Sequence, residues 1–214
     1  MEISIGRQAR DLGVRISLIV MEGITVGESP RVVLEALTSD LKDELRTRYK
    51  APEDLLSDKR IRALRTFYWR IGIDPTKTRP ASEALIRRIL KKEIPSINTL
   101  VDAGNLSSAM TCIPIGLYDL DQVKGPLVMT LTEGGEEFRP IGGEACNLDK
   151  GVPVLMDDEG ILHLYPYRDC MRTRITGDTV NALAVSCGVK GISDTDLGEA
   201  LEKLDGYFYD LSAG

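Results

Sequence analysis

The spacing of apolar residues changes once along this chain, near Cys112, and that change limits the folds it can adopt. Before it, apolar residues recur every three or four positions, as Val33, Leu37 and Leu41 do. This spacing is typical of amphipathic helices. After it, short β-branched runs alternate with glycines, which is typical of strands joined by tight turns. The order of helices, then strands, then helices predicts an α+β domain with one shared core.

The caps and breakers predict where each element begins and ends. We expect strand structure over 14–26, a helix from the Ser29 cap and Pro30 to about Tyr49, and a second helix with an apolar stripe over 61–71. Ser82 and Ser96 are predicted to cap a third and a fourth helix. After a strand meander from Cys112, two helices are expected, over 178–187 and from Ser193 to about Tyr207, the latter with a Ser193–Asp196 capping box.

Composition predicts one domain, residues 1–214, because 43% hydrophobic residues can build a core without covalent staples. The apolar run Ile16–Met21 is too short for a signal peptide or a membrane span, so we expect a cytoplasmic protein with no membrane contact.

The four cysteines form no C-x-x-C pair and are interpreted as buried free thiols. The single histidine, His163, has no ligand-spaced neighbour. No metal site and no cofactor are therefore expected.

Charge is distributed unevenly along the chain. The net charge of -6 argues against a protein coated in nucleic acid, and DNA is not an expected partner. Between Lys42 and Glu93, however, 15 basic residues accompany 8 acidic ones, against 12 and 25 in the rest. A basic third on an acidic body can attract a polyanion to one face. The alternative is that these charges only solvate helix exteriors.

Two polar clusters interrupt the apolar pattern in the middle of the chain. Asn105, Ser107 and Ser108 stand where a helical apolar stripe should continue. They can form a binding surface or satisfy a helix end. Tyr118, Asp119 and Asp121 follow a strand, where two carboxylates two residues apart can hold a ligand or cap a turn.

Two further clusters follow in the second half. In Ile141-Gly142-Gly143-Glu144, consecutive glycines let the backbone approach a ligand that the carboxylate can then bind, although a plain β-turn needs the same residues. Arg168, near Thr173, can bind a phosphate or carboxylate or make a surface contact with Asp169. Serine-hydrolase, P-loop and dinucleotide-binding motifs are missing. Any hydrolysis would therefore depend on a positioned water.

These clusters occur in the order found in a known family. YWRIGIDPTKTRPASEALIRRIL, INTLVDAGNLSSA, IPIGLYDLD, GPLVMTLTEGGEEF with PIGGE, and YRDCMRTRITGDTVNAL span about residues 68–186. Together they resemble the editing, or tRNA-binding, domain of the phenylalanyl-tRNA synthetase beta subunit, including its free-standing relatives. The resemblance implies a layered β/β/α fold in which a short-strand meander is flanked by helices, with a pocket between the sheets that hydrolyses mischarged aminoacyl-tRNA.

The resemblance also implies roles for individual residues. Glu144 and Asn105 would orient water and substrate for hydrolysis. The aminoacylated 3′ end of tRNA would be bound by Ser107, Tyr118, Asp119, Gly142, Gly143, Arg168 and Thr173. The acceptor stem would contact Lys77, Arg79, Arg87 and Arg88.

The chain departs from the family pattern in two places. Gly116 replaces a pocket histidine, and the segment His163 to Arg168 replaces an alanine- and glycine-rich run. These changes predict a different aminoacyl group or a ligand other than tRNA. Three functions are therefore considered: a hydrolase that edits aminoacyl-tRNA in trans, a tRNA- or RNA-binding module without catalysis, and a protein that binds a small metabolite such as a free amino acid.

Overall fold

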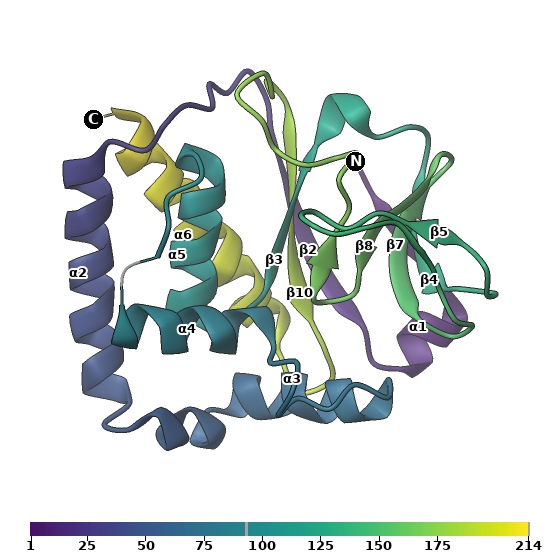
Figure 1. The fold of residues 1–214 in the computed structure, drawn as a ribbon, viewed down its shortest axis with the longest axis horizontal. Helices are drawn as coiled ribbons and strands as arrows, with labels where there is room; N and C mark the ends of the chain where they lie inside the picture. Colours follow the sequence, from purple (N-terminus) through teal and green to yellow (C-terminus); the bar gives the residue numbers. More distant parts are fainter. Residues whose placement is uncertain (93, 214) are drawn as a thin grey trace.

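The computed structural model describes residues 1–92 and 94–213 as three layers, one of helices and two of sheet (Figure 1). Glu93, the last residue of the basic third, and Gly214 lie outside the described residues. In chain order the elements are β1 Ile3–Ile5, α1 Arg7–Asp11, β2 Arg15–Met21, α2 Arg31–Arg48, the 3-10 helix η1 Pro52–Ser57, α3 Lys59–Arg70, α4 Ala81–Lys91, α5 Thr99–Thr111, β3 Ile115–Asp119, the 3-10 helix η2 Leu120–Gln122, β4 Leu127–Leu131, β5 Glu137–Phe138, β6 Cys146–Asn147, β7 Pro153–Asp157, β8 Gly160–Leu164, β9 Arg168–Asp169, β10 Ala182–Gly188 and α6 Asp194–Ala213.

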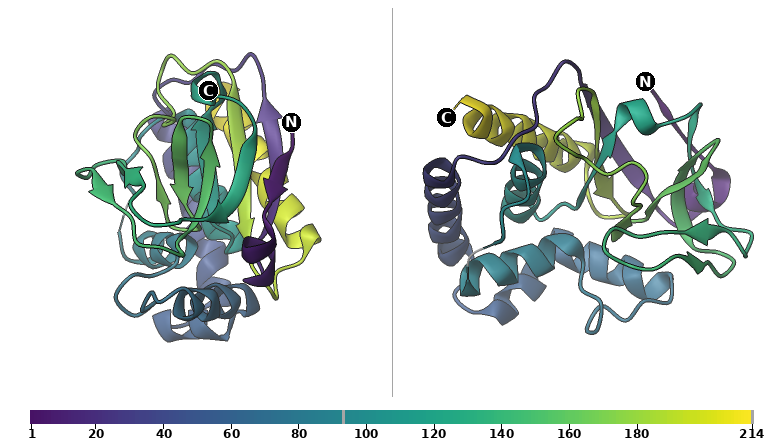
Figure 2. Two further views of the ribbon diagram at one scale, coloured as in Figure 1. Left: turned by 90° about the vertical axis from the view of Figure 1, so that its right-hand side faces the viewer. Right: turned by 45° about the horizontal axis from the view of Figure 1, so that its top comes forward.

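The middle layer is a three-stranded sheet in the order β2-β10-β3, with both pairings antiparallel. The outer layer is a five-stranded sheet in the order β1-β4-β7-β8-β9. Helices α2, α4, α5 and α6 lie on the other side of the middle sheet, and α3 runs along one end of the molecule (Figures 1 and 2). The α+β class and the β/β/α layering predicted from the sequence are confirmed.

Two apolar cores hold these layers together. One joins the helices to the middle sheet and includes Leu45, Leu106 and Leu204. The other fills the space between the two sheets and includes Tyr118, Leu162 and Leu183. Because strand β3 alternates between the two cores, Leu117 faces the helices while Gly116 and Tyr118 face the outer sheet.

The helix expected over 178–187 is wrong, because residues 182–188 form β10, the central strand of the middle sheet. All seven of its residues are buried, since helices cover one face and the outer sheet the other. A strand buried on both faces has a continuous apolar run, which cannot be told from a buried helix by its spacing.

Three expected caps also have other roles. Ser29 and Ser96 both donate to the buried carboxylate of Asp102, at 2.7 and 2.6 Å, and Asn98 caps α5 instead. Ser82 lies inside α4 and donates to the carbonyl of Cys112 at 3.0 Å. The capping box of α6 is confirmed, with the amide of Asp196 donating to Ser193 Oγ at 3.1 Å and the amide of Ser193 to Asp196 Oδ2 at 3.0 Å.

Candidate functional site

The space between the two sheets contains a buried polar cluster formed by Tyr118 on β3, His163 on β8 and Asp169 on β9. The Tyr118 hydroxyl is hydrogen-bonded to His163 Nδ1, and Asp169 Oδ1 lies 3.4 Å from the same nitrogen. His163 Nε2 and Asp169 Oδ1 are buried and have no hydrogen-bond partner within the described part of the chain. We name these three residues the inter-sheet cluster.

Burial changes the protonation of the inter-sheet cluster. Desolvation lowers the pKa of His163 from 6.5 to about 3, so its imidazole is neutral at pH 7. Desolvation also raises the pKa of Asp169 from 3.8 to about 7. About 32% of the Asp169 side chain remains exposed, so water still reaches the part that lies away from Oδ1. The cluster therefore holds a carboxyl group that can exchange a proton with solvent near neutral pH.

Gly116 makes room for this arrangement. A Cβ atom at this position would lie 2.1 Å from the Tyr118 hydroxyl and 3.1 Å from His163 Nδ1. A glycine in a strand often marks such a close approach. The absence of a side chain at Gly116 on β3 therefore leaves space for His163 of β8.

The glycine loop that contains Glu144 lies beside this cluster, next to β9. The amide of Ile141 donates to the carbonyl of Asp169 at 3.0 Å, and Pro140 is bridged to Cys170. Gly142 has a φ of 72°, a left-handed conformation that glycine adopts without strain. Glu144 and Arg168 are both exposed at this edge of the outer sheet.

Asp119 and Thr173 have structural partners near the same edge. The Asp119 carboxylate accepts from Thr179 Oγ1 at 2.8 Å and from the amide of Asp121 at 3.1 Å. Its own amide donates to the carbonyl of Thr173 at 2.8 Å, and the Thr173 hydroxyl lies 3.2 Å from Cys170 Sγ. Asp119 therefore caps the turn after β3, as one of the two interpretations of the aspartate pair predicts.

The structure does not bring Asn105 and Ser107 to this region. Helix α5 packs on the Leu117 face of β3, where a Cβ at Gly104 would lie 2.9 Å from Leu117 Cδ1. Tyr118 lies on the opposite face of the same strand. Ser107 is buried and donates to the carbonyl of Ala200 on α6 at 2.6 Å, a contact between two helices. The middle sheet therefore separates Asn105 and Ser107 from the inter-sheet cluster.

Helices α3 and α4 and the turn between them form a basic segment, residues 59–92. It contains 11 basic residues and only two acidic ones, Asp74 and Glu83. Glu83 is fully buried and pairs with Arg65, Arg87 and Arg79 at 3.0, 2.9 and 3.9 Å. Lys77, Arg79 and Arg88 are exposed, whereas Arg87 is half-buried. The basic segment therefore presents an excess of positive charge to solvent.

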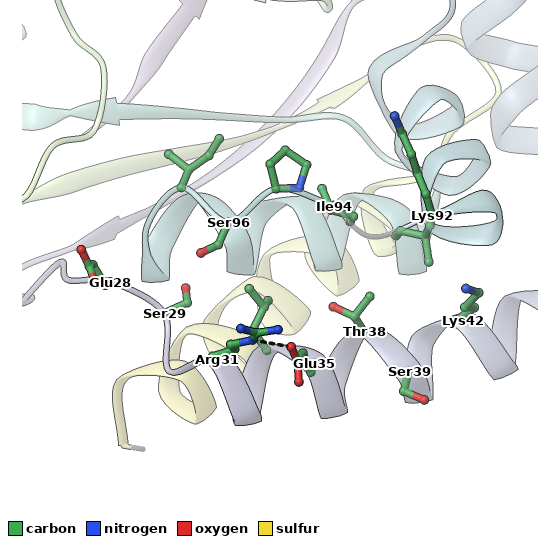
Figure 3. A pocket seen from close by; sticks show the side chains of 14 residues that line it. Glu28, Ser29, Arg31, Glu35, Thr38, Ser39, Lys42, Lys92, Ile94 and Ser96 are labelled. Carbon is green, nitrogen blue, oxygen red and sulfur yellow. Dashed lines mark hydrogen bonds and ion pairs between the residues drawn. The ribbon is translucent and has the colours of Figure 1, made fainter.

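A separate groove of about 750 Å³ lies between α2 and the chain that links α4 to α5 (Figure 3). Thr38, Ser39 and Lys42 line the α2 side, and Lys92, Ile94 and Ser96 line the other. The carboxylate of Asp102 holds its rim in place through the bonds from Ser29 and Ser96. None of the residues predicted for substrate or tRNA binding lines this groove.

Sequence reasoning missed several of these residues. His163 and Asp169 were noted separately, but nothing in the sequence predicted that strand pairing would place them opposite each other. Glu83 was missed because a glutamate between basic residues on an amphipathic helix usually lies at the surface. Of the cysteines, Cys112, Cys170 and Cys187 are buried as predicted, but Cys146 is exposed. Within residues 1–92 and 94–213, no group of three acidic, histidine or cysteine side chains is arranged to hold a metal ion, and no helix is long and apolar enough to cross a bilayer.

The layered fold and the ordered motifs define a domain related to aminoacyl-tRNA synthetases. Residues 63–201, more than half of the chain, match the family model of the B3/4 domain. The chain therefore belongs to the B3/4 domain family.

Several curated relatives are beta subunits of phenylalanine–tRNA ligase. The subunit of Rhodopseudomonas palustris is 33% identical over 85 residues, which cover 40% of this chain and 11% of the subunit. The subunit of Ralstonia nicotianae is 28% identical over 141 residues, which cover 66% of this chain and 16% of the subunit. The chain thus matches only a small part of these relatives.

The fold is also found in a solved structure, an N-terminal fragment of the phenylalanyl-tRNA synthetase beta subunit from Pyrococcus horikoshii. The superposition covers 98% of this chain and 48% of the fragment, with a TM-score of 0.51. Sequence identity is 16%, so this likeness concerns the fold alone.

Proposed function

We propose that this chain binds the aminoacylated 3′ end of a tRNA. The observation that carries the proposal is the basic segment, in which 11 basic residues accompany two acidic ones and one of the two acids is buried. Phosphates are bound mainly by such cations, with an affinity that depends strongly on salt. Lys77, Arg79 and Arg88 are the proposed phosphate contacts, while Arg87 helps to neutralise Glu83.

Salt dependence tests this proposal. Binding of uncharged tRNA, measured by filter retention, should weaken steeply as salt is raised, with a slope of about -0.7 to -0.9 for each phosphate contact. The K77A/R79A double variant should lower that slope by about two. The matched control is K150A, which removes an exposed cation from the outer sheet and should leave the slope unchanged. Undetectable binding at low salt would exclude this function.

We further propose that the bound ester is hydrolysed in trans at the edge formed by the glycine loop and β9. Support comes from family membership and from the position of Glu144, exposed on a loop that is hydrogen-bonded to the Asp169 backbone. Glu144 would accept a proton from the attacking water, and Arg168 would bind a phosphate of the terminal nucleotide. Tyr118, Asp119 and Thr173 would support the edge from within. Asn105 is left out, because α5 lies beyond the middle sheet.

A panel of mischarged tRNAs tests hydrolysis. The chain should release amino acid from at least one of them faster than buffer does, and E144Q should slow that release about 100-fold. E133Q is the control, because Glu133 is also an exposed glutamate near the same hairpin, paired with Lys150 at 3.3 Å. No release from any charged tRNA would exclude the hydrolase while leaving the binding proposal standing.

The groove favours a second candidate, a receptor for a small metabolite such as a free amino acid. Its walls combine hydroxyls with basic and acidic side chains, which suit a ligand that carries both charges (Figure 3). A thermal-shift screen of free amino acids distinguishes the candidates. A rise in melting temperature that T38A/S39A abolishes would support this function. No shift with any amino acid would exclude it.

A further inference from the structure

The only tryptophan of the chain, Trp69, is exposed on α3 within the basic segment. Its two neighbours, Phe67 and Tyr68, are buried against Tyr165 and Tyr167 of the outer-sheet region. Trp69 instead points away from this core, and 59% of it is accessible to solvent. A single exposed apolar side chain is ordinary. An indole surrounded by cations is a different feature, because it suits an aromatic anion.

A rigid basic turn runs alongside Trp69. Arg65, one helical turn earlier on the same side of α3, donates to the carbonyl of Pro75 at 3.3 Å. Figure 1 shows the chain reversing after α3 and returning beside it toward α4. The Asp74 carboxylate fixes the turn by accepting from the amide and the hydroxyl of Thr76, at 2.8 and 2.7 Å. Lys77 and Arg79 project from this fixed turn and are exposed.

The exposed charges on α3 and on the turn after it are positive. Arg62 lies two helical turns before Trp69, Arg70 follows it directly, and Lys77 and Arg79 come on the turn. Arg70 is also anchored, since it donates to the carbonyl of Leu12 at 2.8 Å. The only acids within the basic segment are Asp74, which is hydrogen-bonded within the turn, and Glu83, which is buried.

We infer that Trp69 is a stacking platform for an unpaired nucleobase, with Lys77 and Arg79 binding the adjacent phosphates. This inference rests on the proposed tRNA-binding function and adds a base contact to it. Stacking on an aromatic ring requires a base that is free of a duplex, so the platform would select the single-stranded 3′ end over the paired stem. The surrounding positive charge favours RNA over an apolar protein partner, because phosphates accompany every base.

Fluorescence of the sole tryptophan reports directly on this contact. A short RNA hairpin with an unpaired 3′ end should quench Trp69 emission in a saturable way. The same hairpin with a blunt end should bind through its phosphates without comparable quenching. Equal quenching by both RNAs would overturn the inference, because phosphate contacts alone would then explain the signal.

Variants measure the contribution of the ring. W69A should weaken binding of the hairpin with the unpaired end about tenfold, and W69F should retain most of the affinity. Binding of the blunt hairpin should change less than twofold in W69A. The matched control is Y209A, since Tyr209 is 73% exposed on α6, outside the basic segment. It should bind both hairpins as the wild type does. Melting temperatures confirm that each variant is folded.

Other occupants of this surface give other results. Emission that responds to anionic phospholipid vesicles but not to either RNA would overturn the inference in favour of a membrane surface. Affinity for the unpaired end that W69A leaves unchanged would also overturn it. Quenching without hydrolysis of any charged tRNA would leave the platform standing and exclude the hydrolase. If charged tRNA is hydrolysed and W69A leaves the KM unchanged, the hydrolase stands and the stacking platform is excluded.

Discussion

Glu83 is a fully buried carboxylate and Asp169 a partly buried one, and their surroundings differ. Glu83, on α4, is fully buried and faces three guanidinium groups, from Arg65, Arg79 and Arg87. Asp169, on β9, faces the neutral His163 and the Tyr118 hydroxyl. Three guanidinium groups compensate the charge of Glu83, whereas desolvation raises the pKa of Asp169 to about 7.

The difference explains how each region contributes to the molecule. A compensated carboxylate fixes the positions of its cations, so Glu83 arranges the arginines of the basic segment. A carboxyl group that titrates near pH 7 and reaches water can take up or release a proton under ordinary conditions. Glu83 therefore organises the cations of the helical end, whereas the inter-sheet region holds a carboxyl group whose pKa is raised by desolvation to about 7.

Replacing Glu83 should have the largest effect. We expect E83A to lower the free energy of unfolding by about 3–5 kcal/mol, because it leaves the half-buried Arg65 and Arg87 without their counter-charge. Urea denaturation at neutral pH measures this change. E35A is the matched control, since Glu35 forms the same i,i+4 pair with Arg31 at 2.7 Å on an exposed helix surface. That pair should be worth at most about 1 kcal/mol. Equal losses in the two variants would show that burial at Glu83 is unimportant.

A side chain at Gly116 should disturb the other region. G116A places a methyl group against the Tyr118 hydroxyl and His163, so we expect a loss of about 1–3 kcal/mol. In contrast, G198A on α6 meets no atom within 4 Å and should add up to about 1 kcal/mol through helix propensity. Both are measured by urea denaturation. If G116A leaves the free energy of unfolding unchanged, the inter-sheet cluster can shift to accept the methyl group without cost.

The D169N variant should show how the lowered pKa of His163 makes stability depend on pH. The folded pKa of His163 is about 3 and its unfolded value 6.5, so between these values the unfolded state binds more protons. Stability from this group is therefore lost as the pH falls below 6.5, by at most about 1.4 kcal/mol per pH unit. In the wild type, the raised pKa of Asp169 has the opposite effect, since it adds stability as the pH falls. We expect the urea midpoint of D169N, relative to that of the wild type, to decrease from pH 6.5 to pH 4.

The H163Q variant should show the opposite pH dependence of stability, because only Asp169 of the pair then titrates. The folded pKa of Asp169 is about 7 and its unfolded value 3.8, so here the folded state binds more protons between these values. Its stabilising contribution is lost as the pH rises from 3.8 to 7, with the same upper limit of about 1.4 kcal/mol per pH unit. Urea midpoints of H163Q, taken relative to those of the wild type, should therefore decrease with rising pH, because carboxylates with lowered pKa values such as Asp157 act equally in both proteins. If D169N and H163Q differed from the wild type with pH trends of the same sign, this assignment would be contradicted.

The sequence was sufficient for the class of fold and for most of its elements. Helical spacing identified α2 and α3, and the Ser193–Asp196 pair identified the start of α6, because these signals depend on residues close together in the chain. The central strand β10 was missed because burial on both faces removed the alternation that marks a strand. The serines at 29 and 96 were misinterpreted because their acceptor, Asp102, becomes close to Ser29 only after folding.

The site was less predictable than the fold, for the same reason. Tyr118, Asp119, Thr173 and the glycine loop do gather near β9. Asn105 and Ser107 do not, since spacing along the chain cannot tell which face of a sheet a helix will cover. His163 and Asp169 come together only through the pairing of β8 with β9.

The position of β10 has a consequence for anyone who trims this protein to the stretch shared with its relatives. Strand β2 pairs with β10 over seven residues, from Arg15 opposite Gly188 to Met21 opposite Ala182. Cutting at residue 63, where the family match begins, would remove that partner and leave one side of an apolar strand with bare amide and carbonyl groups. Such fragments should aggregate by edge-to-edge strand pairing, so the first sixty residues protect the edge of β10 in the shared domain.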